Sequence, residues 1–149
     1  MLARKTYSRE EVDHARSDIG ARLASYRRLV SAAGDGARAA LNDFEPLFAN
    51  SLALALDRYF VRRLRMVTGK ESTPLNELEL ICEALMNNDG IFRGNNLVNY
   101  VPEQSVVKLE FDDPIRLTIE QLGNLCLAAL AEIEEKFAEP LPMARQIRP

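Results

Sequence analysis

The sequence contains no tryptophan, one histidine and two cysteines among its 149 residues. Catalysis by a serine or cysteine nucleophile usually needs a nearby base, most often histidine, and His14 is the only histidine here. Two isolated cysteines and one histidine do not make the cluster of ligands that a metal site requires. We therefore expect no catalytic residues, no metal and no cofactor, and we favour a protein that is not an enzyme.

Long hydrophobic runs are missing as well. The most apolar stretch, residues 47–56, is interrupted by Asn50 and Ser51, and no run approaches the roughly 18 residues of a membrane span. Residues 1–10 contain basic side chains without the apolar segment of a secretory signal. We expect a cytoplasmic protein without a membrane segment, in which Cys82 and Cys126 are reduced and buried.

Glycine-rich phosphate loops are also absent. Residues 34–36 lack the third glycine and the preceding strand of a dinucleotide-binding fingerprint. Residues 89–96 are rich in glycine and asparagine but lack the alternating oxygen ligands of a calcium-binding EF-hand loop. The second segment is still where we expect a ligand contact, because loops carry function more often than packed helices.

What is present indicates one globular domain. Hydrophobic residues make up 47% of the chain and charged residues 28%, which are ordinary values for a folded domain. A chain of this length fits one domain and can bury a sizeable core without disulfides or metals. We predict a single helical domain over residues 1–149, with a folded core from about 8 to 138 and a loose tail over 139–149.

Capping signals mark the starts of three helices. Ser8 and Glu11 form a capping box before a long amphipathic stretch that ends at Gly34. Thr73 precedes Pro74, which suits the first position of a helix that ends in the turn at 87–90. A second capping box, at Thr118 and Gln121, begins the last helix.

The central helix is expected to be the longest. We begin it near Glu45, because Pro46 suits a first turn, and end it at Thr68, with Gly69 after it. Its first half is apolar on nearly every face, which is typical of a buried helix.

Residues 91–117 show a different pattern. Val107, Leu109 and Phe111 alternate with Lys108 and Glu110, which is the period of a strand. The predicted fold is therefore mainly α: a compact bundle of about four to five helices with a small β-hairpin inserted before the last helix.

Three arginines of the predicted long helix share one face. Arg58, Arg62 and Arg65 are spaced i, i+4 and i+7, which places them together in a continuous helix. Their guanidinium groups can hold phosphates, but they can also be solvated surface, or an interface with the acidic last helix. Asp57 lies on the apolar part of the same helix, where a buried carboxylate needs a partner; it indicates either a structural ion pair or a polar pocket.

These residues and the loop after residue 89 make up our candidate ligand site. A ligand-binding function requires its members to converge on one concave pocket. The candidate residues are Asp57, Arg58, Arg62, Arg65, Arg93, Asn95 and Asn96.

Charge is divided unevenly along the chain. Residues 1–70 contain 13 Lys/Arg and 8 Asp/Glu, whereas residues 71–149 contain 6 and 14. Nucleic-acid binding through the basic half is the least favoured function, because the chain as a whole is acidic and repels a polyanion. Our leading hypothesis is a non-enzymatic interaction module that forms a homodimer or binds a protein partner. The alternative is a small-ligand or phosphate-binding domain, or an enzyme, that uses the Arg58, Arg62 and Arg65 face.

Overall fold

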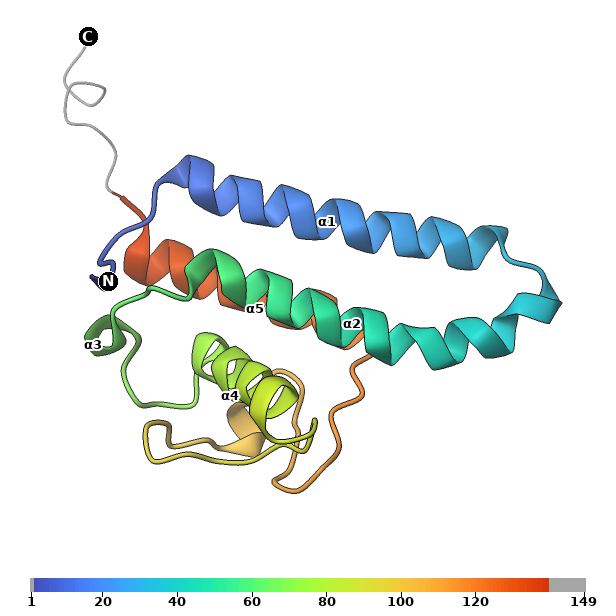
Figure 1. The fold of residues 1–149 in the computed structure, drawn as a ribbon. Coiled ribbons are helices and arrows are strands. Elements are labelled where there is room, and N and C mark those ends of the chain that lie inside the picture. Colours follow the sequence, from blue (N-terminus) through green and yellow to red (C-terminus); the bar gives the residue numbers. More distant parts are fainter. Residues whose placement is uncertain (1, 140–149) are drawn as a thin grey trace, which may run out of the picture.

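Five α-helices make up the fold in the computed structural model, which describes residues 2–139 (Figure 1). They are α1 (Arg9–Ala32), α2 (Arg38–Phe60), α3 (Arg65–Thr68), α4 (Pro74–Asn87) and α5 (Ile119–Phe137), with short 3₁₀ turns η1 (Asp35–Ala37) and η2 (Pro102–Gln104). The predicted mainly helical fold is confirmed. No helix among the described residues has the length and apolar character needed to span a membrane.

The helices pack in three layers. α1 and α2 form an antiparallel hairpin, and α5 lies beside α2 in the central layer (Figure 1). Both central helices contact α1 on one side and α4 on the other. Buried side chains from α1, α2, α4 and α5 form one apolar cluster, which includes the two cysteines, free and buried as predicted. Burial raises the pKa of both thiols, that of Cys126 to about 11.

The predicted helix starts are confirmed. Ser8, Thr73 and Thr118 each have extended backbone angles, and each side-chain oxygen accepts a backbone N–H from the first turn of its helix. The capping boxes of α1 and α5 are complete. The end of α1 differs slightly, because its C-cap is Ala33 and Gly34 has a φ of −79°, so this turn does not require glycine.

The central helix differs from its prediction at both ends. α2 begins at Arg38, so Pro46 lies inside it, and it ends at Phe60 instead of Thr68. The cause of the early end is the N-terminal segment. The Arg4 N–H donates to the Arg62 carbonyl at 2.6 Å, and the Leu64 N–H donates to the Arg4 carbonyl at 2.8 Å. These bonds take backbone groups that a continuing helix would use.

The predicted β-hairpin is wrong. Residues 91–117 contain no strand pair, and the bridges within residues 2–139 are isolated ones, such as that between Ile91 and Pro114. Lys108 and Asp112 have φ values of 63° and 72°, which interrupt an extended strand. Of the three alternating residues, Val107 is buried and Leu109 is half-buried, but Phe111 is 48% exposed, so the alternation matches the burial only in part. The predicted tail lies outside the described residues from position 140 onward.

A buried carboxylate holds this irregular segment in place. Glu77 on α4 is only 1% exposed, and its two oxygens accept the N–H groups of Val106 and Val107, each at 2.8 Å. Desolvation by burial raises the pKa of Glu77, and the two N–H groups oppose that effect. Since an unpaired buried N–H is costly, the segment over 91–117 depends on this side chain.

We expect Glu77→Gln to destabilise the protein by about 1–3 kcal/mol, because the amide nitrogen of glutamine cannot accept the second N–H. The measurement is the free energy of unfolding in urea. Glu83→Gln on the same helix is the control; its side chain is exposed, so we expect a change within about 0.5 kcal/mol. Equal effects of the two substitutions would contradict this role for Glu77.

Candidate functional site

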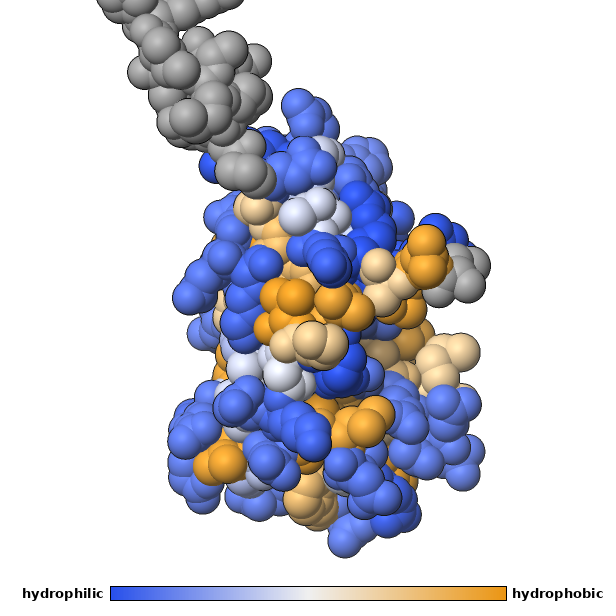
Figure 2. Space-filling model, turned by 90° about the vertical axis from the view of Figure 1, so that its left-hand side faces the viewer, coloured by the Kyte–Doolittle hydropathy of each residue, from blue (hydrophilic) through white to orange (hydrophobic). Residues whose placement is uncertain are grey.

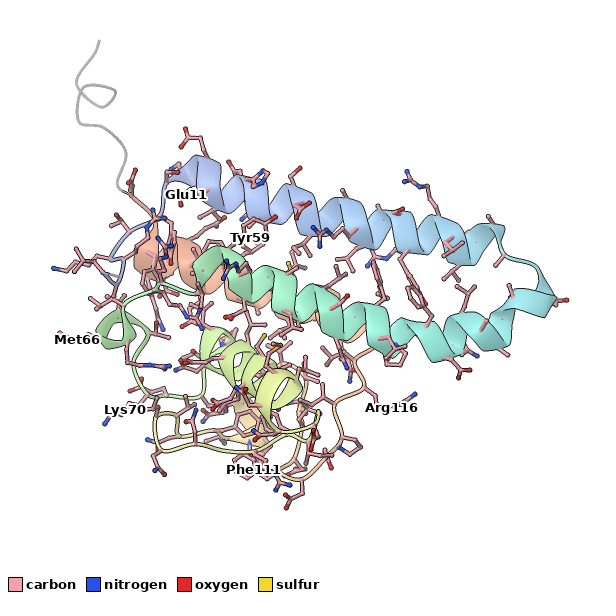
Figure 3. All side chains as sticks on the ribbon, in the orientation of Figure 1. Glu11, Tyr59, Met66, Lys70, Phe111 and Arg116 are labelled. Carbon is pink, nitrogen blue, oxygen red and sulfur yellow. The ribbon has the colours of Figure 1, made fainter. Side chains whose placement is uncertain are left out.

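The seven candidate residues lie in three places, of which the first two adjoin at Val61. Arg58 and Arg62 line one hollow at the end of α2, and Asp57 and Arg65 line a smaller one of about 110 Å³. The remaining three lie on the segment that follows α4. Figure 3 shows this separation: Tyr59, next to Arg58, lies beside α1, whereas Phe111, from the segment after α4, lies beyond α4. The structure therefore does not form the single pocket that the ligand-binding hypothesis required.

Asp57 belongs to an ion pair inside the fold. Its carboxylate lies 3.3 Å from the Arg63 guanidinium, and the two side chains are 21% and 7% exposed. Arg63 also donates to the carbonyls of Phe60 and Leu75. Burial raises the pKa of Asp57, and the positive charge of Arg63 opposes that shift. Asp57 thus has the structural partner that a buried carboxylate needs.

Arg65 is separated from Arg58 and Arg62 because the helix ends before it. Its guanidinium pairs with Glu79 and donates to the Asn76 side chain of α4. Of the loop candidates, Arg93 pairs with Asp112 at 2.7 Å. The Asn95 side chain accepts two backbone N–H groups of its own turn. These contacts organise the chain locally.

A groove that the sequence did not predict runs along α1, first beside α2 and then beside α5. It consists of two adjoining hollows of about 450 and 550 Å³, which share Arg27 and Ile119. The first lies between α1 and α2, and the second between α1 and α5. We call the two together the α1–α5 groove. Its apolar and glycine lining includes Tyr26, Val30, Leu41, Gly20, Leu23, Gly123 and Leu127.

The two glycines of the groove that lie inside helices, Gly20 and Gly123, leave free space in the single chain. A Cβ added at Gly20 would meet no atom within 4 Å, and one at Gly123 would approach nothing closer than 3.8 Å. Glycine inside a helix is less stable than alanine by up to about 1 kcal/mol. Packing within one chain therefore does not account for either glycine, whereas the close approach of another helix would.

The tip of the α1–α2 hairpin lacks a core. The last buried residue of α1 is Tyr26 and the first of α2 is Ala49, so no residue over 27–48 is buried. Figure 1 shows this tip extending beyond the ends of α4 and α5. Two helices alone cannot enclose an apolar core. The exposed apolar side chains of the tip are Leu29, Val30, Phe44 and Leu47.

Charge changes sign along α1. The first half of α1 contains Glu10, Glu11, Asp13 and Asp18, and the end of α5 beside it contains Glu134 and Glu135. The second half of α1 contains Arg22, Arg27 and Arg28. The Arg16 side chain joins the two helices through its ion pair with Glu134. With Arg9 and Arg16 counted as well, α1 is net acidic over residues 9–20 and basic over residues 21–32. The lining of the groove itself has charges of both signs, from Arg16, Arg27 and Arg38 and from Glu45 and Glu120.

The hollow that Arg58 and Arg62 line has a volume of about 470 Å³ and lies at the opposite end of the hairpin from the tip. Its lining includes Arg4, Tyr7 and Tyr59 besides Arg58 and Arg62. The Arg4 guanidinium lies 4.3 Å above the Tyr7 ring and donates two hydrogen bonds to Glu11, at 2.5 and 2.6 Å. This bidentate contact lowers the pKa of Glu11 to about 2.

No family model matches this chain, and comparisons with curated proteins and with solved structures found no match either.

The Arg4–Glu11 pair predicts a defined pH dependence of stability. Because the pKa of Glu11 falls from 4.5 to about 2 on folding, the pair stabilises the fold above pH 4.5 and loses its effect as the pH falls toward 2. We expect Glu11→Gln to destabilise the protein at neutral pH by up to about 1 kcal/mol, since the pair is partly exposed.

The difference in unfolding free energy between wild type and Glu11→Gln should therefore vanish near pH 2. Glutamine keeps the capping box, so the cap does not confound the comparison. Glu10→Gln is the control, because Glu10 is exposed and has no ion pair in the described residues. A difference that stays constant from pH 7 to pH 2 would disprove the linkage.

Proposed function

We propose that this protein is a non-enzymatic helical interaction module that acts as a homodimer through the α1–α5 groove. The observation that carries the proposal is the hairpin tip, where residues 27–48 contain no buried side chain although apolar groups are present. A second copy that packs its own hairpin against this tip supplies the missing layer of helix. Apolar burial is the main driving force of such an association.

The charge pattern supports a second copy as the occupant and indicates its direction. In an antiparallel arrangement, the basic half of α1, with Arg27 and Arg28, lies beside the net acidic first half of the partner's α1. By the two-fold symmetry of a closed dimer, the same contact forms twice. A parallel arrangement places like charges together, which is unfavourable.

The phosphate-binding alternative keeps part of its site, since Arg58 and Arg62 still share a hollow. That hollow lies at a separate end of the molecule from the groove. The proposed location remains the cytoplasm, and free, buried cysteines are typical of a reducing compartment.

We expect light scattering coupled to size-exclusion chromatography to give the mass of a dimer, with dissociation only toward low concentration. Leu127→Asp should convert the protein to a monomer without unfolding it. Leu127 lines the groove and is 66% exposed in the single chain, so a charge is tolerated in the monomer but not at an apolar interface.

Met86→Asp is the matched control, because Met86 on α4 is 67% exposed and lies outside the groove. It should remain dimeric. Loading concentrations should run from about 1 μM to 1 mM, which covers dissociation free energies of about 8 to 4 kcal/mol. A wild-type monomer throughout this range would exclude self-association and favour a different protein as the partner.

We expect spin labels at the two hairpin tips of the dimer to lie far apart. In the antiparallel arrangement we place the two-fold axis near Leu23, a residue of the groove. Gly36 lies about 13 residues from Leu23 in each copy, so at the helical rise of about 1.5 Å per residue the labels on Gly36→Cys should be separated by roughly 40 Å. Labels on Ser17→Cys should be much closer. Both positions are exposed. Short distances between the tips would show a parallel dimer and reject the charge argument.

A further inference from the structure

The hollow at the end of α2 brings together side chains from two distant parts of the sequence. Arg58 and Tyr59 come from the last turn of α2, and Arg62 from the residues just after it, whereas Arg4 precedes α1. The backbone bonds between Arg4 and the chain at Arg62 and Leu64 fix this arrangement. The hollow belongs to the end of the molecule that Figure 2 shows, where hydrophilic atoms surround a central apolar patch.

Two of its arginines have free guanidinium groups. Arg58 and Arg62 are exposed, and within residues 2–139 neither makes an ion pair or a side-chain hydrogen bond. Other described arginines, such as Arg28, also lack an ion pair, but Arg58 and Arg62 are the two that line this hollow together. Two neighbouring free guanidinium groups repel each other and favour an anion between them.

Arg4 is held in a fixed orientation at the same hollow. Two of its N–H groups bind Glu11 and its plane lies over Tyr7. A guanidinium has five N–H donors, so three remain for a ligand. The negative charge of Glu139 also contributes to the raised pKa of Arg4. The Asp18 carboxylate, which accepts from the Tyr59 hydroxyl, pairs with Arg22, so it does not neutralise Arg58 or Arg62.

We infer that this hollow binds the phosphate group of a small phosphate ester. Arginine recognises phosphate through two parallel hydrogen bonds, and Arg58 and Arg62 are both free to make them. The volume of about 470 Å³ exceeds what one phosphate needs and lies in the range of small-molecule pockets. The half-buried ring of Tyr59 in its wall offers apolar surface to the organic part, whereas Tyr7 is buried beneath Arg4. This inference does not depend on the dimer.

The test is titration calorimetry of the full chain with inorganic phosphate and with adenosine monophosphate, at constant ionic strength set by chloride. We expect both probes to bind. Arg58→Gln and Arg62→Gln should each weaken binding by about tenfold, because each removes a charged hydrogen-bond donor. Arg28→Gln is the matched control, since Arg28 is an exposed arginine on α1 outside this hollow, and it should bind as wild type does.

The two probes distinguish the sources of the phosphate group. Tighter binding of the nucleotide identifies an ester whose organic part is also held, and equal binding identifies the phosphate group alone. No binding of either probe, or equal affinities of Arg58→Gln, Arg62→Gln and Arg28→Gln, would overturn the inference. Leu127→Asp should retain full phosphate affinity, so this result is separable from the failure of the proposed dimer.

Discussion

The backbone pairing of Arg4 with the chain just after α2 is the contact on which the rest of this structure depends. Two hydrogen bonds, to the Arg62 carbonyl and from the Leu64 N–H, stop α2 at Phe60. Because the helix stops, Arg63 turns inward to Asp57 and Arg65 turns toward Glu79 on α4. The same bonds hold the arginine-lined hollow together. One short segment before α1 thus determines helix length, an internal ion pair and a binding surface.

The α1–α2 hairpin connects two surfaces with different chemistry. At its tip, apolar side chains lack a covering layer, and at its other end Arg58 and Arg62 lack carboxylate partners within the described residues. The first surface suits another helix and the second suits an anion, because apolar burial and charge pairing require different neighbours. The body of the molecule between them is closed by buried carboxylates, of which Glu77 and Glu132 bind backbone N–H groups of neighbouring segments.

The candidate site was only partly predictable. Sequence spacing placed Arg58, Arg62 and Arg65 on one helical face, and that spacing holds only while the helix continues. The bond to Arg4 lies far away in sequence, so no local signal reveals it. The groove was missed for a related reason: Gly20 and Gly123 lie on different helices, and their proximity exists only after α1 and α5 have packed. The sequence predicted that the apolar side chains of the tip lie along one side of a helix. It did not predict that no other helix of the same chain covers them.

By itself, the sequence determined where α1, α4 and α5 begin and which of their faces are buried. Capping side chains act within one turn of the helix, and apolar periodicity acts along one element, so both can be read without tertiary contacts. Only the tertiary structure decided where α2 ends and that residues 91–117 form no hairpin. In both places the backbone groups bind partners from other segments, namely the backbone of Arg4 and the carboxylate of Glu77. A buried backbone group takes whichever partner the packed fold provides.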